Sequence, residues 1–242
     1  MRVLIISDIH ANLTALAAVI AAAGKVDAVW CLGDLVGYGP DPNECINLIR
    51  SLPNLICLVG NHDAAAIGNL DLAAFNRDAS LSARWMQTTL SASNLQFLHD
   101  LPEKVIVEQV TLTHGSPRNP IWEYILDTYA ATQNFTNFDT QLCFVGHTHL
   151  PVAYLQDEIT HRLDWKMTRM GHPLILSGRA ILNPGSVGQP RDHDPRAAYA
   201  IFYPENKKWE PFRVDYEIAS VQLRIYNAGL PHRHALRLAE GW

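Results

Sequence analysis

Seven polar side chains directly follow apolar runs of the chain, and their types are those that bind transition metals. "FVGHTHLPV" (144–152) places His147 and His149 on either side of one threonine, and "VTLTHG" (110–115) contains His114. The other four are Asp8 and His10 after "RVLIIS" (2–7), Asp34 after "DAVWCLG" (27–33) and Asn61 after "NLICLVG" (54–60). Imidazole nitrogens with carboxylate and amide oxygens, and no thiolate, favour Mn²⁺, Fe, Zn²⁺, Co²⁺ or Ni²⁺ over Ca²⁺.

The number of these ligands predicts two ions rather than one. Four histidines, two aspartates and one asparagine exceed the need of one tetrahedral zinc, and they suit two five- or six-coordinate ions that share Asp34. Two ions ~3.5–4 Å apart stabilise both oxygens of an in-line displacement at phosphorus, and water bound between them is a nucleophile at neutral pH. The residues therefore predict hydrolysis of a phosphate ester by direct attack of a metal-bridging hydroxide, with two Mn²⁺ ions as the first choice.

His62 and Asp63 suggest a second catalytic function beside the ligands. His62 follows Asn61, and Asp63 could orient the imidazole ring and favour its charged form. An imidazolium that faces the leaving-group oxygen is a general acid, which typically contributes ~10²–10⁴-fold to the rate. We therefore predict that both residues are catalytic.

Strands and helices at the observed spacing would bring these side chains to one edge of a sheet. We expect strands over 2–7, 27–33 and 54–60, alternating with helices over 12–24 and 41–52. Such units form parallel sheets with right-handed crossovers, and ligands bind beyond the carboxyl ends of the strands. Further along, we expect helical structure over 71–100, a hairpin or two short strands over 104–115, a helix over 121–131 and a strand over 141–146.

Short strands joined by turns follow, and this pattern is typical of a second, largely antiparallel sheet. They cover residues 152–156, 159–165, 173–178, 180–183, 197–203 and 209–216. Residues 217–242 are expected to be helical, with a break at 228–231, and to pack on the core or face a second copy in a homo-oligomer. Since no repeat or linker divides the sequence, we expect one domain over residues 1–242.

Composition excludes several classes of protein. The 242 residues are 48% hydrophobic with a net charge of −5, which argues against an extended surface for nucleic acid or anionic membrane. No apolar stretch reaches the ~18–20 residues of a membrane span, and the N-terminus lacks the long apolar run of a signal peptide. Four scattered cysteines without a CxxC motif suit a reducing cytosol. We expect a cytoplasmic protein.

Five motifs in order, "DIH", "GDLVG", "GNHD", "THG" and "GHTH", resemble those of the calcineurin-like metallophosphoesterases. "GDLVGYGPDPNE", "HGSPRNP" and "NPGSVGQPRDHDPRAAYAIF" are similar to the small single-domain bacterial and archaeal members. The resemblance implies an α/β fold, a four-layer α/β/β/α sandwich of two mixed sheets. It implies a first metal site of Asp8, His10, Asp34 and His149, a second of Asp34, Asn61, His114 and His147, and His62 as the acid. Ala11 and His193 depart from the common pattern, in ways that concern substrate fit.

The turn-rich segment 183–196 has two interpretations. It could be a surface loop with a tight turn at 183–185, or it could border the site, with Arg191 or Arg196 pairing a substrate phosphate oxygen. Asn12 similarly could cap a helix or act beside the ligands, so it joins the two arginines as a substrate-binding candidate.

Other residues near these motifs are less informative. The loop around Tyr38 could wall a pocket, whereas the aromatic residues of "IWEYILDTY" (121–129) are expected in the core rather than as a platform for a base. His193 could approach the site. Five histidines belong to no cluster: His99, His161, His172, His232 and His234.

These residues favour a phosphoesterase that acts on a small phosphodiester or nucleotide. A phosphomonoesterase or protein serine/threonine phosphatase on the same centre is the first alternative. A scaffold that binds metal without catalysis is the second. All seven ligand positions and His62 are present, which favours an enzyme.

Overall fold

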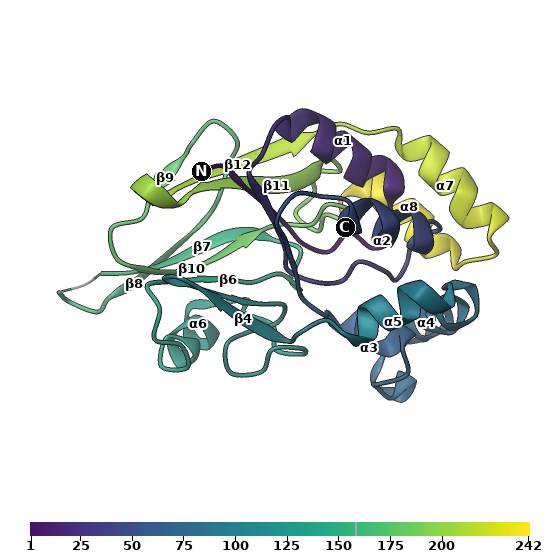
Figure 1. Cartoon of the computed structure of the whole chain (residues 1–242), viewed down its shortest axis with the longest axis horizontal. Helices are drawn as coiled ribbons and strands as arrows, with labels where there is room; N and C mark the ends of the chain where they lie inside the picture. The colour runs from purple at the N-terminus through teal and green to yellow at the C-terminus, as the bar shows by residue number, and fades with distance from the viewer. Residues whose placement is uncertain (158) are drawn as a thin grey trace.

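The computed structural model describes residues 1–157 and 159–242, and its framework is a pair of six-stranded mixed sheets (Figure 1). The strands are β1 (Val3–Ile6), β2 (Ala28–Cys31), β3 (Leu55–Cys57), β4 (Lys104–Val107), β5 (Val110–Thr113), β6 (Leu142–Phe144), β7 (Pro151–Gln156), β8 (Leu163–Met167), β9 (Leu174–Ile175), β10 (Arg179–Pro184), β11 (Ala197–Tyr203) and β12 (Lys208–Val214). The first sheet has the order β3-β2-β1-β11-β12-β9 and the second β4-β5-β6-β10-β7-β8. The expected α/β class with two mixed sheets is confirmed.

Helices cover the outer faces of the two sheets. They are α1 (Leu13–Ala23), α2 (Pro42–Arg50), α3 (Asn61–Ala66), α4 (Arg77–Thr89), α5 (Ala92–His99), α6 (Thr128–Asn134), α7 (Ile218–Asn227) and α8 (His232–Glu240), with short 3₁₀ turns at Leu72–Ala74 and Pro204–Asn206. Apolar side chains of α1, α2, α4 and α5 pack on the first sheet, and those of α6 pack on the second. A third apolar layer, which includes Trp30, Phe144 and Trp209, fills the space between the sheets. The layers therefore run helix, sheet, sheet, helix.

The strand–helix–strand repeat at the start of the chain folds as predicted. β1 pairs in parallel with β2, and β2 pairs in parallel with β3. Asn12 caps α1 by accepting from the backbone N–H of Ala15, and Pro42 lies in the first turn of α2. Because the three strands run in parallel, the polar residues that follow them all lie at one edge of the first sheet.

The strands after residue 150 do not form a sheet of their own, so that prediction is wrong. β11 lies antiparallel beside β1, with Val3 opposite Phe202, and β12 and β9 extend the first sheet. β7, β8 and β10 instead join β4, β5 and β6. Period-2 hydrophobicity specifies which face of a strand is buried, but it does not specify the neighbouring strand.

The helix expected over 121–131 begins only at Thr128. The side chain of Asp127 accepts from the backbone N–H of Ala130 and caps α6 there, so residues 121–127 form an irregular loop. The helical region expected over 71–100 divides into α4 and α5, which Asn76 and Ser91 cap. The break at 228–231 between α7 and α8 is confirmed.

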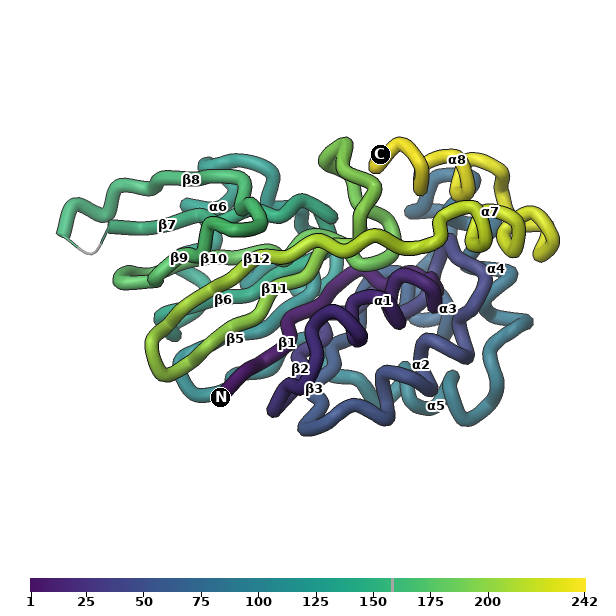
Figure 2. The backbone as a smooth tube through the Cα atoms, turned by 90° about the horizontal axis from the view of Figure 1, so that it is seen from above, coloured from purple at the N-terminus to yellow at the C-terminus, as the bar shows by residue number. Residues whose placement is uncertain are grey.

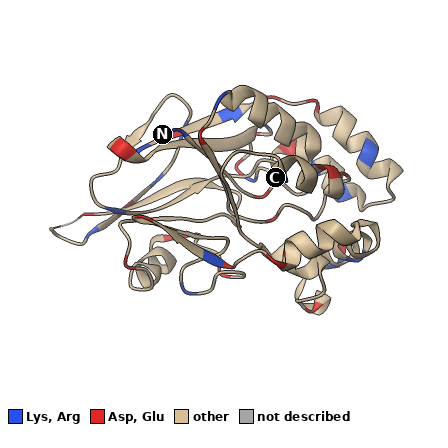
Figure 3. Cartoon of the chain, in the orientation of Figure 1, with Lys and Arg blue, Asp and Glu red and all other residues tan. Residues whose placement is uncertain are grey.

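Figure 2 shows α7 and α8 at the end of the molecule opposite the β7–β8 hairpin. Lys and Arg are interspersed with Asp and Glu along the described chain in Figure 3, in keeping with its mild net charge. Among the described residues, no helix has the length and apolar character to cross a bilayer.

Candidate active site

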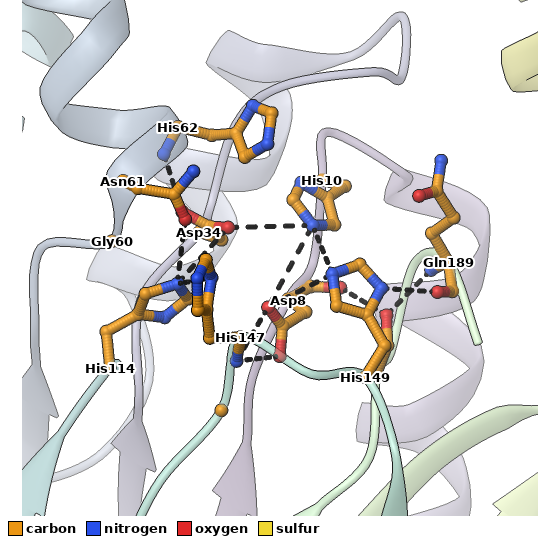
Figure 4. Close-up of polar contacts among 12 residues, drawn as sticks. Asp8, His10, Asp34, Gly60, Asn61, His62, His114, His147, His149 and Gln189 are labelled. Carbon is orange, nitrogen blue, oxygen red and sulfur yellow. Dashed lines mark hydrogen bonds and ion pairs between the residues drawn. The ribbon is translucent and has the colours of Figure 1, made fainter. Parts of the chain in front are cut away.

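The loops that follow the strands bring two groups of metal-binding side chains together (Figure 4). Asp8, His10 and His149 form the first group, and each offers a ligand atom within 4.8 Å of the others. The second group, by the same criterion, is Asp34, His114 and His147. Asn61 extends the second group, since its Oδ1 lies 3.2 Å from Nε2 of His114. All seven predicted ligands are buried side by side.

The Asp34 carboxylate lies between the two groups. Its Oδ2 is 3.7 Å from Nε2 of His10 and 3.3 Å from Nε2 of His114. That oxygen is buried and accepts no hydrogen bond from the described residues, whereas Oδ1 accepts from the backbone N–H of His62 at 2.8 Å. A buried carboxylate oxygen without a donor is costly unless a cation is shared there, so the geometry fits a bridging ligand.

Backbone carbonyls orient the four imidazoles of the two groups. Each ring directs one nitrogen at a carbonyl oxygen: His10 at Val36, His114 at Leu32, His147 at Trp122 and His149 at Gln189. Since a carbonyl only accepts, that nitrogen carries the hydrogen, and the other nitrogen of a neutral ring is a lone pair. Such carbonyl-bound histidines are typical of metal ligands.

The lone-pair nitrogens face one another within each group. Nε2 of His10 lies 3.0 Å from Nε2 of His149, and Nε2 of His114 lies 3.2 Å from Nδ1 of His147. Two lone pairs at such distances repel each other unless a cation or proton lies between them. With the Asp34 oxygen, these pairs make the donor set fit two divalent ions.

Burial and mutual charge shift the pKa values of the ligands. Burial lowers the pKa of His10 and His149 well below the ordinary value, and it raises the pKa of Asp8 to about 7. Burial also opposes the charge on His114, but the carboxylates of Asp34 and Asp8 outweigh it and raise that pKa to about 9. Several of these groups therefore exchange protons in the same pH range in which metals bind.

Five of the ligands adopt a backbone conformation that non-glycine residues rarely take. Asp8, His10, Asp34, His147 and His149 have φ between 49° and 64°, and Ala11 has φ 50°. Each such residue costs about 1 kcal/mol or more, and such strain concentrates at functional sites. Here it turns side chains from separate strands toward one point.

The segment 183–196 donates hydrogen bonds to these strained loops. Nδ2 of Asn183 donates to the carbonyl of Gly146 at 2.6 Å and to Oγ1 of Thr148 at 3.0 Å, and Oγ of Ser186 donates to the carbonyl of Asp8 at 2.8 Å. Residues 183–190 are buried, so this part of the segment borders the site, whereas residues 191–196 are partly exposed. The tight turn is also present, since Gly185 has φ 83°.

His62 lies beside both groups but belongs to neither. Its ring contacts His10, Tyr38 and Phe75 at centroid distances of 5.0, 4.4 and 5.3 Å, and its Nδ1 has no hydrogen-bond partner among the described residues. Burial lowers the pKa of His62 to about 4, and the positive charge of Arg191 adds to this effect. Burial therefore favours the neutral ring in the protein alone.

Asp63 does not orient the His62 ring, which corrects the sequence-based prediction. Its carboxylate is fully buried and accepts from the backbone N–H groups of Val36 and Gly60, both at 3.0 Å. Asp63 therefore fixes the Asp34 loop to the start of α3. Its position at N3 of that helix, where acidic side chains commonly accept from the N-cap backbone, was the signal for this role.

A sequence model for the calcineurin-like phosphoesterase superfamily domain matches residues 1–207. The chain belongs to that superfamily. With the two ligand groups, this membership identifies the protein as a metal-dependent phosphoric ester hydrolase. Both the resemblance and the enzyme class predicted from the motifs are confirmed.

Similar proteins span the whole phosphoesterase chain. The crystal structure of a metallophosphoesterase from Sphaerobacter thermophilus is 51% identical with a TM-score of 0.92, and the match covers 100% of this chain and 99% of that one. An uncharacterised protein of Methanocaldococcus jannaschii is 36% identical over 252 residues, which is 98% of this chain and 97% of its own. A hypothetical protein of Pyrococcus horikoshii shares the fold, with 20% identity, a TM-score of 0.81 and coverage of 100% and 98%.

One partial match concerns a named enzyme. The symmetrical bis(5′-nucleosyl)-tetraphosphatase of Pectobacterium carotovorum is 36% identical over 67 residues, which cover 26% of this chain and 24% of that protein.

A cavity of about 700 Å³ opens beside the ligand groups of the phosphoesterase. Tyr38, Tyr124, Thr148 and Arg191 contribute to its lining. The Tyr124 ring stacks on the His147 imidazole at 3.8 Å and is 44% exposed, so the expectation that the aromatics of 121–129 are all in the core is wrong. These residues form an irregular loop rather than a helix, and the loop directs Tyr124 to the site.

Two histidines outside the motifs also lie near this cavity. His234 was expected to belong to no cluster, but it is buried, lines the cavity and contacts the Tyr38 ring at 4.8 Å. His193 stacks on Trp242, another lining residue, at 5.1 Å. Nothing in the local pattern around His234 indicated this, because α8 reaches the site only through the packing of α7 and α8.

Two predicted substrate contacts lie elsewhere. The Arg196 guanidinium pairs with Asp194 at 2.7 and 3.0 Å and does not line the cavity. Asn12 is buried, with Oδ1 capping α1 and Nδ2 donating to the carbonyl of Gly188 at 3.0 Å. Neither lines the cavity, so of the three candidates only Arg191 does.

Proposed function

We propose that this phosphoesterase hydrolyses a small phosphodiester or nucleotide with water, without a covalent intermediate on the protein. The observation that supports this most is the Asp34 carboxylate, whose unpaired Oδ2 faces an imidazole of each ligand group. When bound, two divalent ions would activate water and offset the charge of the phosphoryl group.

His62 is proposed as the proton donor to the leaving group. Its ring contacts Tyr38, Phe75 and His10, the last of which belongs to the first ligand group. A bound phosphate would bring negative charge beside the ring and favour its protonated form, against the effect of burial. The Asp34 carboxylate holds the backbone N–H of His62 and so fixes the donor relative to the ligand groups.

Manganese is the proposed metal. The donors are four imidazoles, two carboxylates and one amide oxygen, and this mixture without thiolate suits Mn²⁺, with Fe, Zn²⁺, Co²⁺ and Ni²⁺ as alternatives. Metal analysis of protein purified from its native host checks this assignment.

The four cysteines support a reducing compartment such as the cytoplasm. All are buried free thiols, and Cys31 lies opposite Cys57 on neighbouring strands without a disulfide. Fractionation of native cells tests the location.

The cavity beside the ligand groups supports a nucleotide over a phosphoprotein. Tyr124 presents aromatic surface next to the second group, and about 700 Å³ is within the range of small-molecule sites. The partial likeness to a bis(5′-nucleosyl)-tetraphosphatase points the same way.

The test is a substrate panel with metal-reconstituted protein. Bis(p-nitrophenyl) phosphate, p-nitrophenyl phosphate, a phosphoserine peptide and a set of nucleotides are compared by kcat/KM with Mn²⁺. We expect the diester and nucleotides to exceed the peptide. A peptide preference would indicate a protein phosphatase, and tight metal binding without turnover of any ester would indicate a scaffold.

A further inference from the structure

Four arginines line the cavity beside the ligand groups. Arg77 comes from the first turn of α4, Arg191 from the segment 183–196, and Arg233 and Arg237 from α8. Within the described part of the chain, none of the four forms an ion pair with an Asp or Glu side chain, and Asp78 is the one acidic residue of the lining. The lining therefore has more cationic than acidic side chains, although Asp78 and the nearby Glu240 offset part of the positive charge.

Two of these arginines show the effect of placing like charges close together in a partly buried space. Burial lowers the pKa of Arg237 to about 10, and the positive charges of Arg191 and Arg233 lower it further. Nε of Arg191 is buried without a hydrogen-bond partner among the described residues, although Nη2 donates to Gln189 at 3.1 Å. Like charges gathered in a partly buried space are stabilised by a bound anion.

The same cavity carries aromatic surface at both of its ends. Near the ligand groups, Tyr124 stacks on His147 and Tyr38 contacts both His10 and His62. At the outer wall, the Trp242 side chain is 51% exposed and stacks on His193 at 5.1 Å. Tyr124 and Trp242 are exposed rings of the lining, whereas Tyr38 is buried, and a nucleobase stacks on exposed rings of this kind.

The outer wall comes from a part of the chain beyond the superfamily match. That match ends at residue 207, whereas α8 and Trp242 supply Arg233, Arg237 and the indole. Figure 2 shows the end of the chain beside the loop that precedes β11, and the backbone N–H of His193 donates to the carbonyl of Gly241 at 2.8 Å. Arg237 also donates through Nε to the Trp242 carbonyl. The wall is thus fixed to the segment that carries Arg191.

We propose that α8 and Trp242 bind the non-reacting part of the substrate, and that this part is a nucleoside carrying further phosphates. The inference rests on the proposed function, because it places the reacting phosphate at the ligand groups. A monoanionic diester phosphate there is already opposed by the charge of two cations, so four more guanidiniums are in excess for it. A nucleoside polyphosphate supplies both the additional anionic groups and the aromatic base.

The test measures binding of a slowly hydrolysed nucleotide to metal-loaded protein. Adenosine 5′-(β,γ-methylene)triphosphate, AMP and inorganic tripolyphosphate are titrated calorimetrically into the wild type and into the double variant Arg233→Gln/Arg237→Gln. We expect the triphosphate analogue to bind the wild type at least about tenfold more tightly than either AMP or tripolyphosphate. The double variant should bind it about 10- to 100-fold more weakly, with a shallower salt dependence, since two charge-assisted contacts are lost.

Arg169→Gln is the matched control. Arg169 is exposed beyond β8 and does not line the cavity, so the same change of charge there should leave all three affinities unaltered. Arg233→Gln alone carries the test if the double variant is less stable, because Arg233 is exposed and its substitution does not disturb the core.

Unchanged affinity of the double variant for the triphosphate analogue would overturn the proposal. Equal binding of tripolyphosphate and the nucleotide would also overturn it, because the nucleoside would then add no affinity through the aromatic rings. Turnover of bis(p-nitrophenyl) phosphate, measured separately on the wild type, reports on the proposed function alone. A wild type that hydrolyses this diester but fails the binding test would contradict the inference and leave the proposed function standing.

Discussion

Replacing Asp34 with asparagine removes the oxygen that the two ligand groups share. Oδ1 could still accept from the backbone N–H of His62, so the change is confined to the charge and to Oδ2, which faces His10 and His114. The first group would keep one carboxylate, Asp8. The second would keep only neutral donors, from His114, His147 and Asn61.

The size of the effect follows from this difference. Loss of an outer hydrogen-bond partner of a ligand typically lowers metal affinity 10- to 100-fold, so loss of a direct, charged ligand should cost at least about 100-fold at each site. We expect the larger loss in the second group. A second effect appears without metal: Asp34 is the main cause of the rise in the pKa of His114 from 6.5 to about 9, a gap worth ~3 kcal/mol. In Asp34→Asn that pKa should fall, because only Asp8 and the Leu32 carbonyl then oppose the effect of burial.

Two measurements check these expectations. Elemental analysis after desalting gives the number of ions retained, and NMR titration of the metal-free protein gives the His114 pKa. Asp139→Asn is the control, because Asp139 is exposed, makes no ion pair within the described chain and changes the net charge equally. Two ions held by Asp34→Asn with affinity within a few-fold of the wild type would refute the shared-ligand reasoning.

Three further predictions concern the groups around the centre. His62→Ala should retain both ions and lower kcat by ~10²–10⁴-fold, most for esters with poor leaving groups; equal losses for good and poor leaving groups would contradict a proton donor. Metal binding should strengthen as pH rises, because Asp8 and His114 bind metal only when deprotonated. Their pKa values are about 7 and about 9, so binding should release about two protons near pH 6 and about one near pH 8. Calorimetry in buffers of different ionisation enthalpy counts these protons, and a constant number would argue against the assignment. Asp63→Ala should lower the free energy of unfolding by about 2–6 kcal/mol in urea denaturation, since two buried N–H groups lose their acceptor, and a loss below about 1 kcal/mol would exclude this role.

The ligand side chains were predictable because each one is tied to a local pattern. Asp8, Asp34 and Asn61 follow strands of a parallel repeat, and such strands end at a common edge. The positive φ of the ligands was not predictable, since aspartate and histidine carry no signal for it comparable with glycine. Asp127, a common N-cap type, was a readable sign that α6 begins at Thr128, and it was missed.

The sequence by itself determined the chemistry of the centre, because residue type and spacing after each strand specify which donors are available. The tertiary structure alone decided how the late strands divide between the sheets and which residues line the cavity. β1 pairs with β11 and α8 packs beside Tyr38 across nearly the whole length of the chain. Such long-range contacts depend on which apolar faces can be buried together, and neither periodicity nor local propensity records that choice.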